Sequence, residues 1–213
     1  MQTESNNKNE AKERILKQGA SGGYMQTWHG KKIYLDVAKF NPNDVILDDV
    51  IHHLPCINRY CGATAYPYSV AQHCIALARS YRRRWQAEED PIVAAHLQIL
   101  EKQAFIHDWT EAFTNDLLAP FKQLMPEIKF LDDHMINAIL KRNNLGDELD
   151  LDVVEMDRRM CRNEMDLFGS PNVPKWWHVL EPVPMVDNYD LYARSIEDVR
   201  STFRNYADLL GVK

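Results

Sequence analysis

The hydrophobic positions along the chain recur at helical spacing in most segments. In residues 69–85 the apolar side chains fall at steps of three and four, and Ser69 is a typical N-cap residue. Similar spacing predicts later helices at residues 90–113 (as one helix or two), 127–144, 147–168 and 190–211. An earlier helix is expected from Asp44 to about residue 53, and Pro120 is expected to interrupt the helical pattern. With one short extended piece at residues 32–37, the pattern predicts an all-α protein.

Composition narrows this picture only moderately. The 213 residues are 45% hydrophobic and 26% charged, which is typical of a soluble globular protein. Residues 1–23 are polar and are expected to form a flexible arm, and residues 24–213 to form a single domain. The net charge of -6 argues against a broad nucleic-acid-binding surface. No apolar run is long enough to span a membrane, and the polar start does not resemble a secretory signal, so we expect a cytoplasmic protein.

Ionisable residues lie on the apolar faces of three predicted helices. His73 shares a face with four apolar residues, and His107 with Asp108 follows the apolar run at residues 104–106. Asp157 lies in the middle of a third inward stripe. The members of that stripe are Val153, Val154, Asp157, Met160, Cys161 and Glu164. Because a buried charge is costly unless it is paired or bound to a metal, the ionisable side chains on these faces require an ion-pair partner or a metal ion.

Each of these residues has an ordinary explanation when it is taken alone. A single inward histidine is usually a satisfied core residue, and Asp157 has three nearby arginines with which it could pair on a solvated face. Together, however, His73, His107, Asp108 and Asp157 form a good set of ligands for a divalent metal. Imidazole nitrogen with carboxylate oxygen suits Zn, Mn, Co or Fe, whereas an all-oxygen set would favour Mg or Ca.

Two of the four cysteines raise a second metal hypothesis, a zinc site, for which the sequence support is weak. Cys56 and Cys61 follow His52 and His53, but the spacing matches no structural zinc pattern, and no CxxC pair is present. Reduced thiols are the expectation for all four cysteines, and Cys74 and Cys161 fit small core positions.

The spaced residues resemble the H…HD…D pattern of the HD-domain phosphohydrolase superfamily. Three segments are similar to those of small bacterial 5'-deoxynucleotidases and phage dATP triphosphohydrolases. They are NRYCGATAYPYSVAQH, HDWTEAFTNDLLAPFK and VVEMDRRMCRNEMDLF. The resemblance covers roughly residues 24–170. It implies an HD-domain helical bundle in which His73, His107, Asp108 and Asp157 hold one divalent transition metal in the core. Zn, Co or Mn is expected there, with Mg as a further option alongside a triphosphate.

The resemblance also implies roles for the surrounding residues. Water activated by the metal would attack the phosphorus nearest the sugar. Glu111 would orient water or pass a proton, and Asp116 would protonate the leaving 5' oxygen or bind the sugar. The alternatives for these two residues are a surface position for Glu111 and a helix stop signal for Asp116. Which carboxylate is the acid stays open.

Four more residues are candidates for substrate binding. Arg59 and Lys122 would neutralise phosphate charge, Arg59 through a bidentate contact. Tyr60 and Trp109 would contact the base or the deoxyribose, with packing in the core as the alternative for each. The basic segment RSYRRR could offer further charge to a longer phosphate tail.

These expectations lead to a metal-dependent deoxynucleotide phosphohydrolase. Hydrolysis of dATP to deoxyadenosine and triphosphate is the leading version, and a 5'-deoxynucleotidase acting on monophosphates is the alternative. An alarmone hydrolase and a non-catalytic HD nucleotide-binding module are less favoured. The resemblance also implies a homo-oligomer. The aromatic segment with Trp176 and Trp177 could form the subunit interface, cover the pocket or cap the core.

Overall fold

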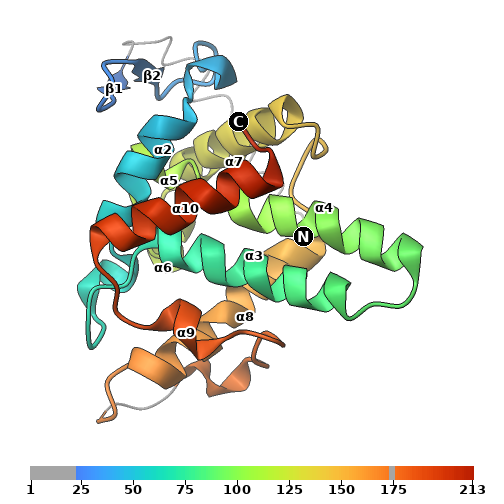
Figure 1. The fold of residues 1–213 in the computed structure, drawn as a ribbon. Coiled ribbons are helices and arrows are strands. Elements are labelled where there is room, and N and C mark those ends of the chain that lie inside the picture. The colour runs from blue at the N-terminus through green and yellow to red at the C-terminus, as the bar shows by residue number, and fades with distance from the viewer. Residues whose placement is uncertain (1–22, 173–175) are drawn as a thin grey trace, which may run out of the picture.

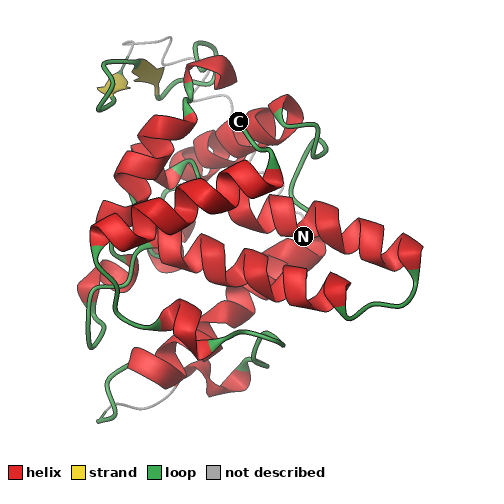
Figure 2. Ribbon diagram, viewed as in Figure 1, coloured by secondary structure: helices red, strands yellow, loops and turns green. Residues whose placement is uncertain are grey.

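The computed structural model describes residues 23–172 and 176–213. Within these ranges the protein is mostly helical, as the periodicity predicted, with a single short hairpin of strands (Figure 2). The predicted arm at residues 1–23 lies outside the described residues, except for its last position. No helix among the described residues is both long enough and apolar enough to cross a membrane.

The elements follow one another along the chain with short connections (Figure 1). The strands are β1 (Tyr24–Gln26) and β2 (Lys32–Tyr34), which pair in antiparallel register. The described α-helices are α2 (Leu47–His53), α3 (Val70–Gln86), α4 (Pro91–Ile106), α5 (Glu111–Thr114), α6 (Ala119–Leu124), α7 (Pro126–Arg142), α8 (Leu151–Phe168), α9 (Asn188–Leu191) and α10 (Ile196–Leu210). Residues 23–172 and 176–213 also contain four 3-10 turns: η1 (Pro42–Asp44), η2 (Leu54–Cys56), η3 (Arg59–Gly62) and η4 (Trp176–Val179).

The helices α3 and α4 form an antiparallel pair at the centre of the molecule (Figure 1). Ser69 begins α3 with a capping box, because its hydroxyl accepts from the Gln72 N–H at 3.3 Å and the Gln72 side chain accepts from the Ser69 N–H at 3.2 Å. The predicted start of this helix is therefore confirmed. Because α10 lies across α3 and α8 packs against both α3 and α4, the central pair contributes side chains to the interior on several sides.

Aromatic side chains fill the interface between α4 and α10. The ring centroids of Phe105 and Phe203 are 4.4 Å apart, and Tyr206 meets Phe105 edge to face. Trp109 is fully buried and packs against the same two phenylalanines. Its position is that of a core residue, which was one of the two interpretations of Trp109.

Several predicted helix boundaries are wrong. The helix expected from Asp44 begins at Leu47, after the separate turn η1. The last predicted helix is divided, since Ser195 caps a new helix, α10, with its hydroxyl at 3.2 Å from the Asp198 N–H. The extended piece is one strand of a hairpin whose other strand was not predicted. Isolated turns and caps of this kind do not disturb the apolar period, so periodicity alone does not reveal them.

Two further findings concern the surroundings of the candidate ligands. Residues 90–113, predicted to form one helix or two, form two: α4 ends at Ile106 and α5 begins at Glu111, with His107 and Asp108 in the turn between them. In α8, Val154 was expected on the inward stripe but is 49% exposed. The inward face of α8 instead contains Val153, Met160 and Glu164, all buried, with Asp157 between them.

Candidate metal centre

Four side chains from three helix regions converge in the interior. His73 lies in the first turns of α3, His107 caps the C-terminus of α4, and Asp108 follows it in the turn. Asp157 comes from the second turn of α8. One ligand atom from each residue lies within 4.8 Å of all the others. The structure thus brings together the four residues that the sequence predicted to be metal ligands.

The distances between the ligand atoms suit one metal ion. His73 Nε2 lies 3.2 Å from His107 Nε2 and 2.9 Å from Asp157 Oδ1, and His107 Nε2 lies 3.1 Å from Asp108 Oδ2. The longer pairs are His107 with Asp157 at 3.6 Å and His73 with Asp108 at 3.8 Å. Ligands bonded at about 2.1 Å are separated by about 3.0 to 3.4 Å at octahedral or tetrahedral angles. The residues therefore fit a divalent transition metal.

Hydrogen bonds on the opposite ring nitrogens orient both imidazoles. His107 Nδ1 donates to the Ala104 carbonyl oxygen at 2.7 Å, and His73 Nδ1 donates to Glu164 Oε1 at 2.6 Å. With the proton held at Nδ1, the neutral tautomer of each ring directs the Nε2 lone pair toward the other ring and the two aspartates. Four acceptors that face one point repel one another unless a positive charge lies between them.

In the metal-free protein, protons supply that charge. Burial lowers the pKa of His107, but the charge of Asp108 and hydrogen bonds to Asp108 and Asp157 outweigh it and raise the pKa well above its usual value. The pKa of His73 is raised as well, against burial and the charge of Arg59, by Glu164 and Asp157. Burial raises the pKa of Asp157, but its bonds to His107 and His73 hold that pKa well below the usual range. A metal ion and these protons compete for the same lone pairs.

Arg59 lies at the edge of the four ligands and contacts three carboxylates. Its Nη1 donates to Asp108 Oδ2 at 3.2 Å, its Nη2 is 4.0 Å from Asp157 Oδ1, and its Nε is 3.5 Å from Glu164 Oε2. The side chain is 13% exposed, so these contacts are shielded from water. The residue predicted to bind phosphate, Arg59, is therefore beside the ligands and paired with carboxylates there.

Glu111 and Lys122 form a second charged group next to the ligands. Lys122 Nζ is 3.2 Å from both Glu111 Oε1 and Asp132 Oδ2, and Thr110 donates its hydroxyl to the other Asp132 oxygen. Burial and the charge of Asp108 raise the pKa of Glu111 well above its usual value, although Lys122 opposes this. Among the described residues, the buried Glu111 Oε2 has no hydrogen-bond partner. Glu111 is thus a carboxyl group suited to hold and release a proton.

Asp116 and Tyr60 meet across two loops. Asp116 Oδ2 accepts the backbone N–H of Tyr60 at 3.2 Å, and the Tyr60 hydroxyl donates to Glu164. Burial raises the pKa of Asp116, with Asp108 adding to that shift and Arg59 opposing it. The two residues lie beside the ligands, as expected of residues that bind substrate, although each also holds a loop in place.

Other predicted contributors lie away from the ligands. The basic segment of α3 is used in ion pairs: Arg79 and Arg83 contact Asp190, Arg82 contacts Glu101, and Arg84 contacts Asp152. These arginines were expected to be available to a phosphate tail, but in the structure each has a carboxylate partner. The RSYRRR segment therefore stabilises the contacts of α3 with α9, α4 and α8.

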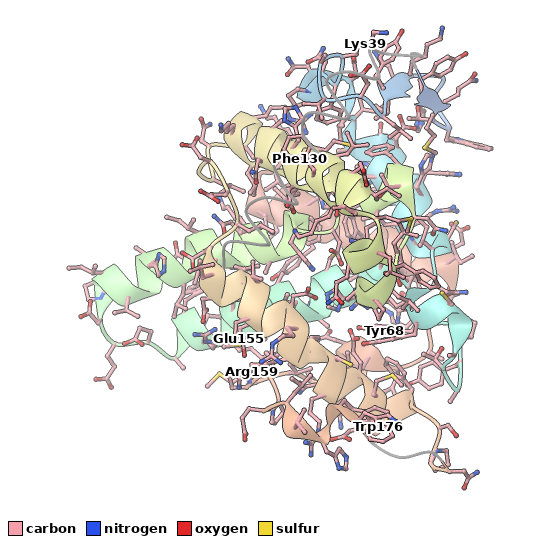
Figure 3. All side chains as sticks on the ribbon, turned by 180° about the vertical axis from the view of Figure 1, so that it is seen from behind. Lys39, Tyr68, Phe130, Glu155, Arg159 and Trp176 are labelled. Carbon is pink, nitrogen blue, oxygen red and sulfur yellow. The ribbon has the colours of Figure 1, made fainter. Side chains whose placement is uncertain are left out.

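The Trp176–Trp177 pair is only half exposed. Trp176 is 80% exposed and lies at the opposite end of the molecule from Lys39 (Figure 3). The indole N–H of Trp177 donates to Asp166 Oδ1 at 3.0 Å, which fastens η4 to α8. Trp177 thus has a partner within the chain, and Trp176 is the member of the pair that presents an apolar surface.

A groove of about 740 Å³ lies next to α5 and apart from the four candidate ligands. It is lined by the first strand and by α2 and α5, and includes Trp28, His53, Phe113 and Asn115. Of the site residues only Glu111 borders it, and the four candidate ligands do not. Trp28 stacks on His52 at this groove, with ring centroids 4.2 Å apart. The two histidines that precede Cys56 therefore contact a tryptophan and the groove, consistent with the absence of a zinc pattern.

Sequence reasoning overlooked two residues of this region. Glu164 was placed on the inward stripe of α8 but given no role, and Asp132 was not singled out. The spacing from Asp157 to Glu164 is two helical turns, which puts both carboxylates on one face of α8. A second inward carboxylate at that spacing was the signal that could have identified Glu164. Asp132 has no comparable signal, because its partner Lys122 is on another helix.

Comparison with known proteins finds a bacterial relative of this chain. No family model matches the chain. The chain is 27% identical over 168 residues to YfdR, an uncharacterized protein of Escherichia coli (strain K12). The match covers 79% of this chain and 84% of that protein. The two chains are thus similar over most of their lengths.

Proposed function

We propose that this protein is a metal-dependent phosphohydrolase of the HD-domain type that acts on deoxynucleotides. The observation that carries the proposal is the convergence of His73, His107, Asp108 and Asp157, with both imidazoles held by bonds at Nδ1. Two nitrogens and two carboxylates favour Zn, Co or Mn as the bound ion. A divalent ion at this place polarises a phosphoryl oxygen and makes a nearby water more acidic.

The protein's own residues supply the rest of the proposed chemistry. Arg59, already 3.2 Å from Asp108, orients and neutralises a phosphate next to the ligands. Glu111 exchanges the proton of the attacking water or the leaving group, because its raised pKa lets it hold a proton to a higher pH than an ordinary carboxyl group. Asp116 is the alternative proton donor and the candidate contact for the sugar. The bond broken is the one between the 5' oxygen and the phosphorus nearest the sugar.

The length of the phosphate tail separates two versions of this function. The resemblance to phage enzymes supports dATP, cleaved to deoxyadenosine and triphosphate, as the leading substrate. One observation favours the second version, a 5'-deoxynucleotidase acting on monophosphates. The arginines of α3, which would have served a triphosphate, are all paired with carboxylates elsewhere. Arg59 and Lys122 remain near the ligands, and a monophosphate needs less positive charge than a triphosphate.

Product analysis tests the proposal and separates its versions. Purified protein is loaded with Mn, Co, Zn or Mg and incubated with individual deoxynucleotides and ribonucleotides. Triphosphate released from dATP supports the leading version, and phosphate released only from monophosphates supports the second. Pyrophosphate removed from an alarmone would instead place the protein in that branch of the superfamily. Tight metal binding without turnover of any nucleotide would favour a non-catalytic binding module and contradict the proposal.

We also propose that the protein works as a homo-oligomer, with Trp176 as a contact residue. Tryptophan is enriched among the residues that dominate protein interfaces, and Trp176 is 80% exposed at one end of the molecule. Sedimentation of the wild-type protein and of Trp176→Ser measures this. A wild-type protein that sediments as a monomer at micromolar concentration would contradict the proposal.

A further inference from the structure

We propose that Glu164 is a positioning residue that joins the metal ligand His73 to the loop bearing Arg59 and Tyr60. The carboxylate is fully buried and uses its two oxygens in different directions. Oε1 accepts from His73 Nδ1 at 2.6 Å, and Oε2 accepts from the Tyr60 hydroxyl and lies 3.5 Å from Arg59 Nε. One side chain on α8 therefore contacts both the proposed metal site and the proposed phosphate-binding loop.

On the side of the proposed metal site, Glu164 determines which ring nitrogen of His73 has a lone pair available for a metal. A carboxylate that accepts from Nδ1 fixes the proton there and leaves Nε2 as the ligand atom. It also makes the imidazole more basic, because its negative charge stabilises the positive charge that a bound metal shares with the ring. Three groups that donate hydrogen bonds or carry positive charge face this buried carboxylate: His73 Nδ1 at 2.6 Å, the Tyr60 hydroxyl, and Arg59 Nε at 3.5 Å. These contacts fix the position of the Glu164 carboxylate against the His73 ring.

Toward the loop, Glu164 holds a backbone that is otherwise unfavourable. Tyr60 and Cys61 are consecutive non-glycine residues in the left-handed region, with φ of 57° and 52°. Such residues persist only where surrounding contacts determine the conformation. Two contacts hold Tyr60: its hydroxyl donates to Glu164, and its N–H donates to Asp116. Because Arg59 precedes Tyr60 in the same turn, the direction of its guanidinium depends on these contacts.

The consequence is a coupling between metal binding and the order of this loop. When a metal draws electron density from His73 Nε2, the Nδ1–H becomes a stronger donor and holds the Glu164 carboxylate more firmly. The same carboxylate then holds Tyr60 and Arg59. By linkage, an ordered loop favours metal binding to the same extent. The substrate side of this inference rests on the proposed function, whereas the metal side and the loop side do not require any turnover.

Two variants, Glu164→Gln and Tyr60→Phe, separate the contact of Glu164 with His73 from its contact with the loop. Glu164→Gln keeps the shape of the side chain but removes its charge. It is expected to weaken affinity for Zn²⁺ or Co²⁺ about 10- to 100-fold, measured by competition with a chelating dye. Tyr60→Phe removes only the loop contact. Metal affinity is expected to change far less, while KM for the nucleotide rises. Glu164→Asp, which keeps the charge, is expected to restore part of the metal affinity.

Hydrogen exchange of the peptide spanning residues 57–68 reports on the loop without any substrate. Zn²⁺ is expected to slow exchange in this peptide of the wild-type protein, and to do so much less in Glu164→Gln and Tyr60→Phe. Circular dichroism confirms that each variant is folded, and Tyr60→Phe tests the loop contact by itself if Glu164→Gln does not fold. Wild-type metal affinity in Glu164→Gln would overturn the inference, as would equal protection of the loop in all variants. A wild-type protein that hydrolyses no nucleotide but shows these metal effects would overturn the proposed function alone.

Discussion

Two buried clusters on α3 and α4 contain carboxylates but differ in the balance of donors and acceptors. In the first, Glu101 on α4 is 2% exposed and accepts from Arg82 Nε and Trp85 Nε1, each at 2.7 Å, and from the Tyr206 hydroxyl. Both oxygens of the carboxylate face donors. In the second, the Nε2 atoms of His73 and His107 are 3.2 Å apart and face two more acceptors, Asp108 and Asp157.

The difference shows which buried charge is structural. At Glu101 the protein itself supplies every donor, so the cluster is complete and connects α3, α4 and α10. At His73 and His107 the protein supplies acceptors and orients them with bonds on the far side of each ring. Arg59 donates to Asp108 at the edge of this group, but acceptor atoms that face one another require a cation or protons between them. The balance of donors and acceptors distinguishes the two clusters.

The largest expected effect comes from removing a ligand at the second cluster. Asp157→Ala should abolish metal retention, measured as metal content by atomic emission. Activity should fall more than about 100-fold, because a lost ligand costs more than the 10- to 100-fold typical of a lost outer partner. Helical content should persist, since the Asp157 side chain is 37% exposed. A metal-full and active Asp157→Ala protein would show that the ligand assignment is wrong.

Metal addition should stabilise the fold through the second cluster only. At a free metal concentration of 100 times Kd, the free energy of unfolding should rise by about 2.7 kcal/mol. Thermal denaturation with and without a chelator measures this shift. Asp157→Ala provides the matched control, in which the shift should disappear, whereas Glu101→Gln should retain it. A stabilisation that survives in Asp157→Ala would place the metal elsewhere.

Disrupting the first cluster should lower the stability of the fold without changing metal binding. Glu101→Gln cannot accept equally from Arg82, Trp85 and Tyr206, and we expect a loss of about 2 kcal/mol in the free energy of unfolding. For a chain of this size that corresponds to a decrease in Tm of about 4–8 °C. Urea denaturation checks the loss, and the metal content should equal that of the wild type. If Glu101→Gln lost its metal while remaining stable, the two clusters would not be separable.

A pH dependence of metal binding should belong to the second cluster alone. Because the pKa values of His107 and His73 are raised in the metal-free protein, protons compete for their lone pairs up to a higher pH than on a free imidazole. Metal must displace these protons, so its affinity should rise as pH rises, about tenfold per pH unit for each proton released. The increase should end once the pH exceeds the raised pKa values. Titration of Zn²⁺ binding between pH 6 and 8 measures the slope, and an affinity that does not change with pH would contradict it.

The sequence predicted correctly those features whose pattern lies within a single helix. The mostly helical fold followed from the apolar period, and the start of α3 from Ser69. The inward positions of His73 and Asp157 followed from their spacing among apolar neighbours. The ligand chemistry of two histidines and two aspartates then grouped these residues with the adjacent His107 and Asp108, and the resemblance to HD-domain proteins implied the same set. The structure brings all four together.

Tertiary structure alone decided which charges neutralise one another. The period of a helix reports the face on which a residue lies, but it contains no information about the partner on another helix. For this reason the arginines of α3 seemed available although α9, α4 and α8 neutralise them, and Glu164 seemed to be an ordinary stripe residue. The sequence by itself determined that His73, Asp157 and Glu164 lie on the inward faces of their helices. The packing of α3, α4 and α8 determined that donors meet acceptors at Glu101, while acceptors meet acceptors at His73.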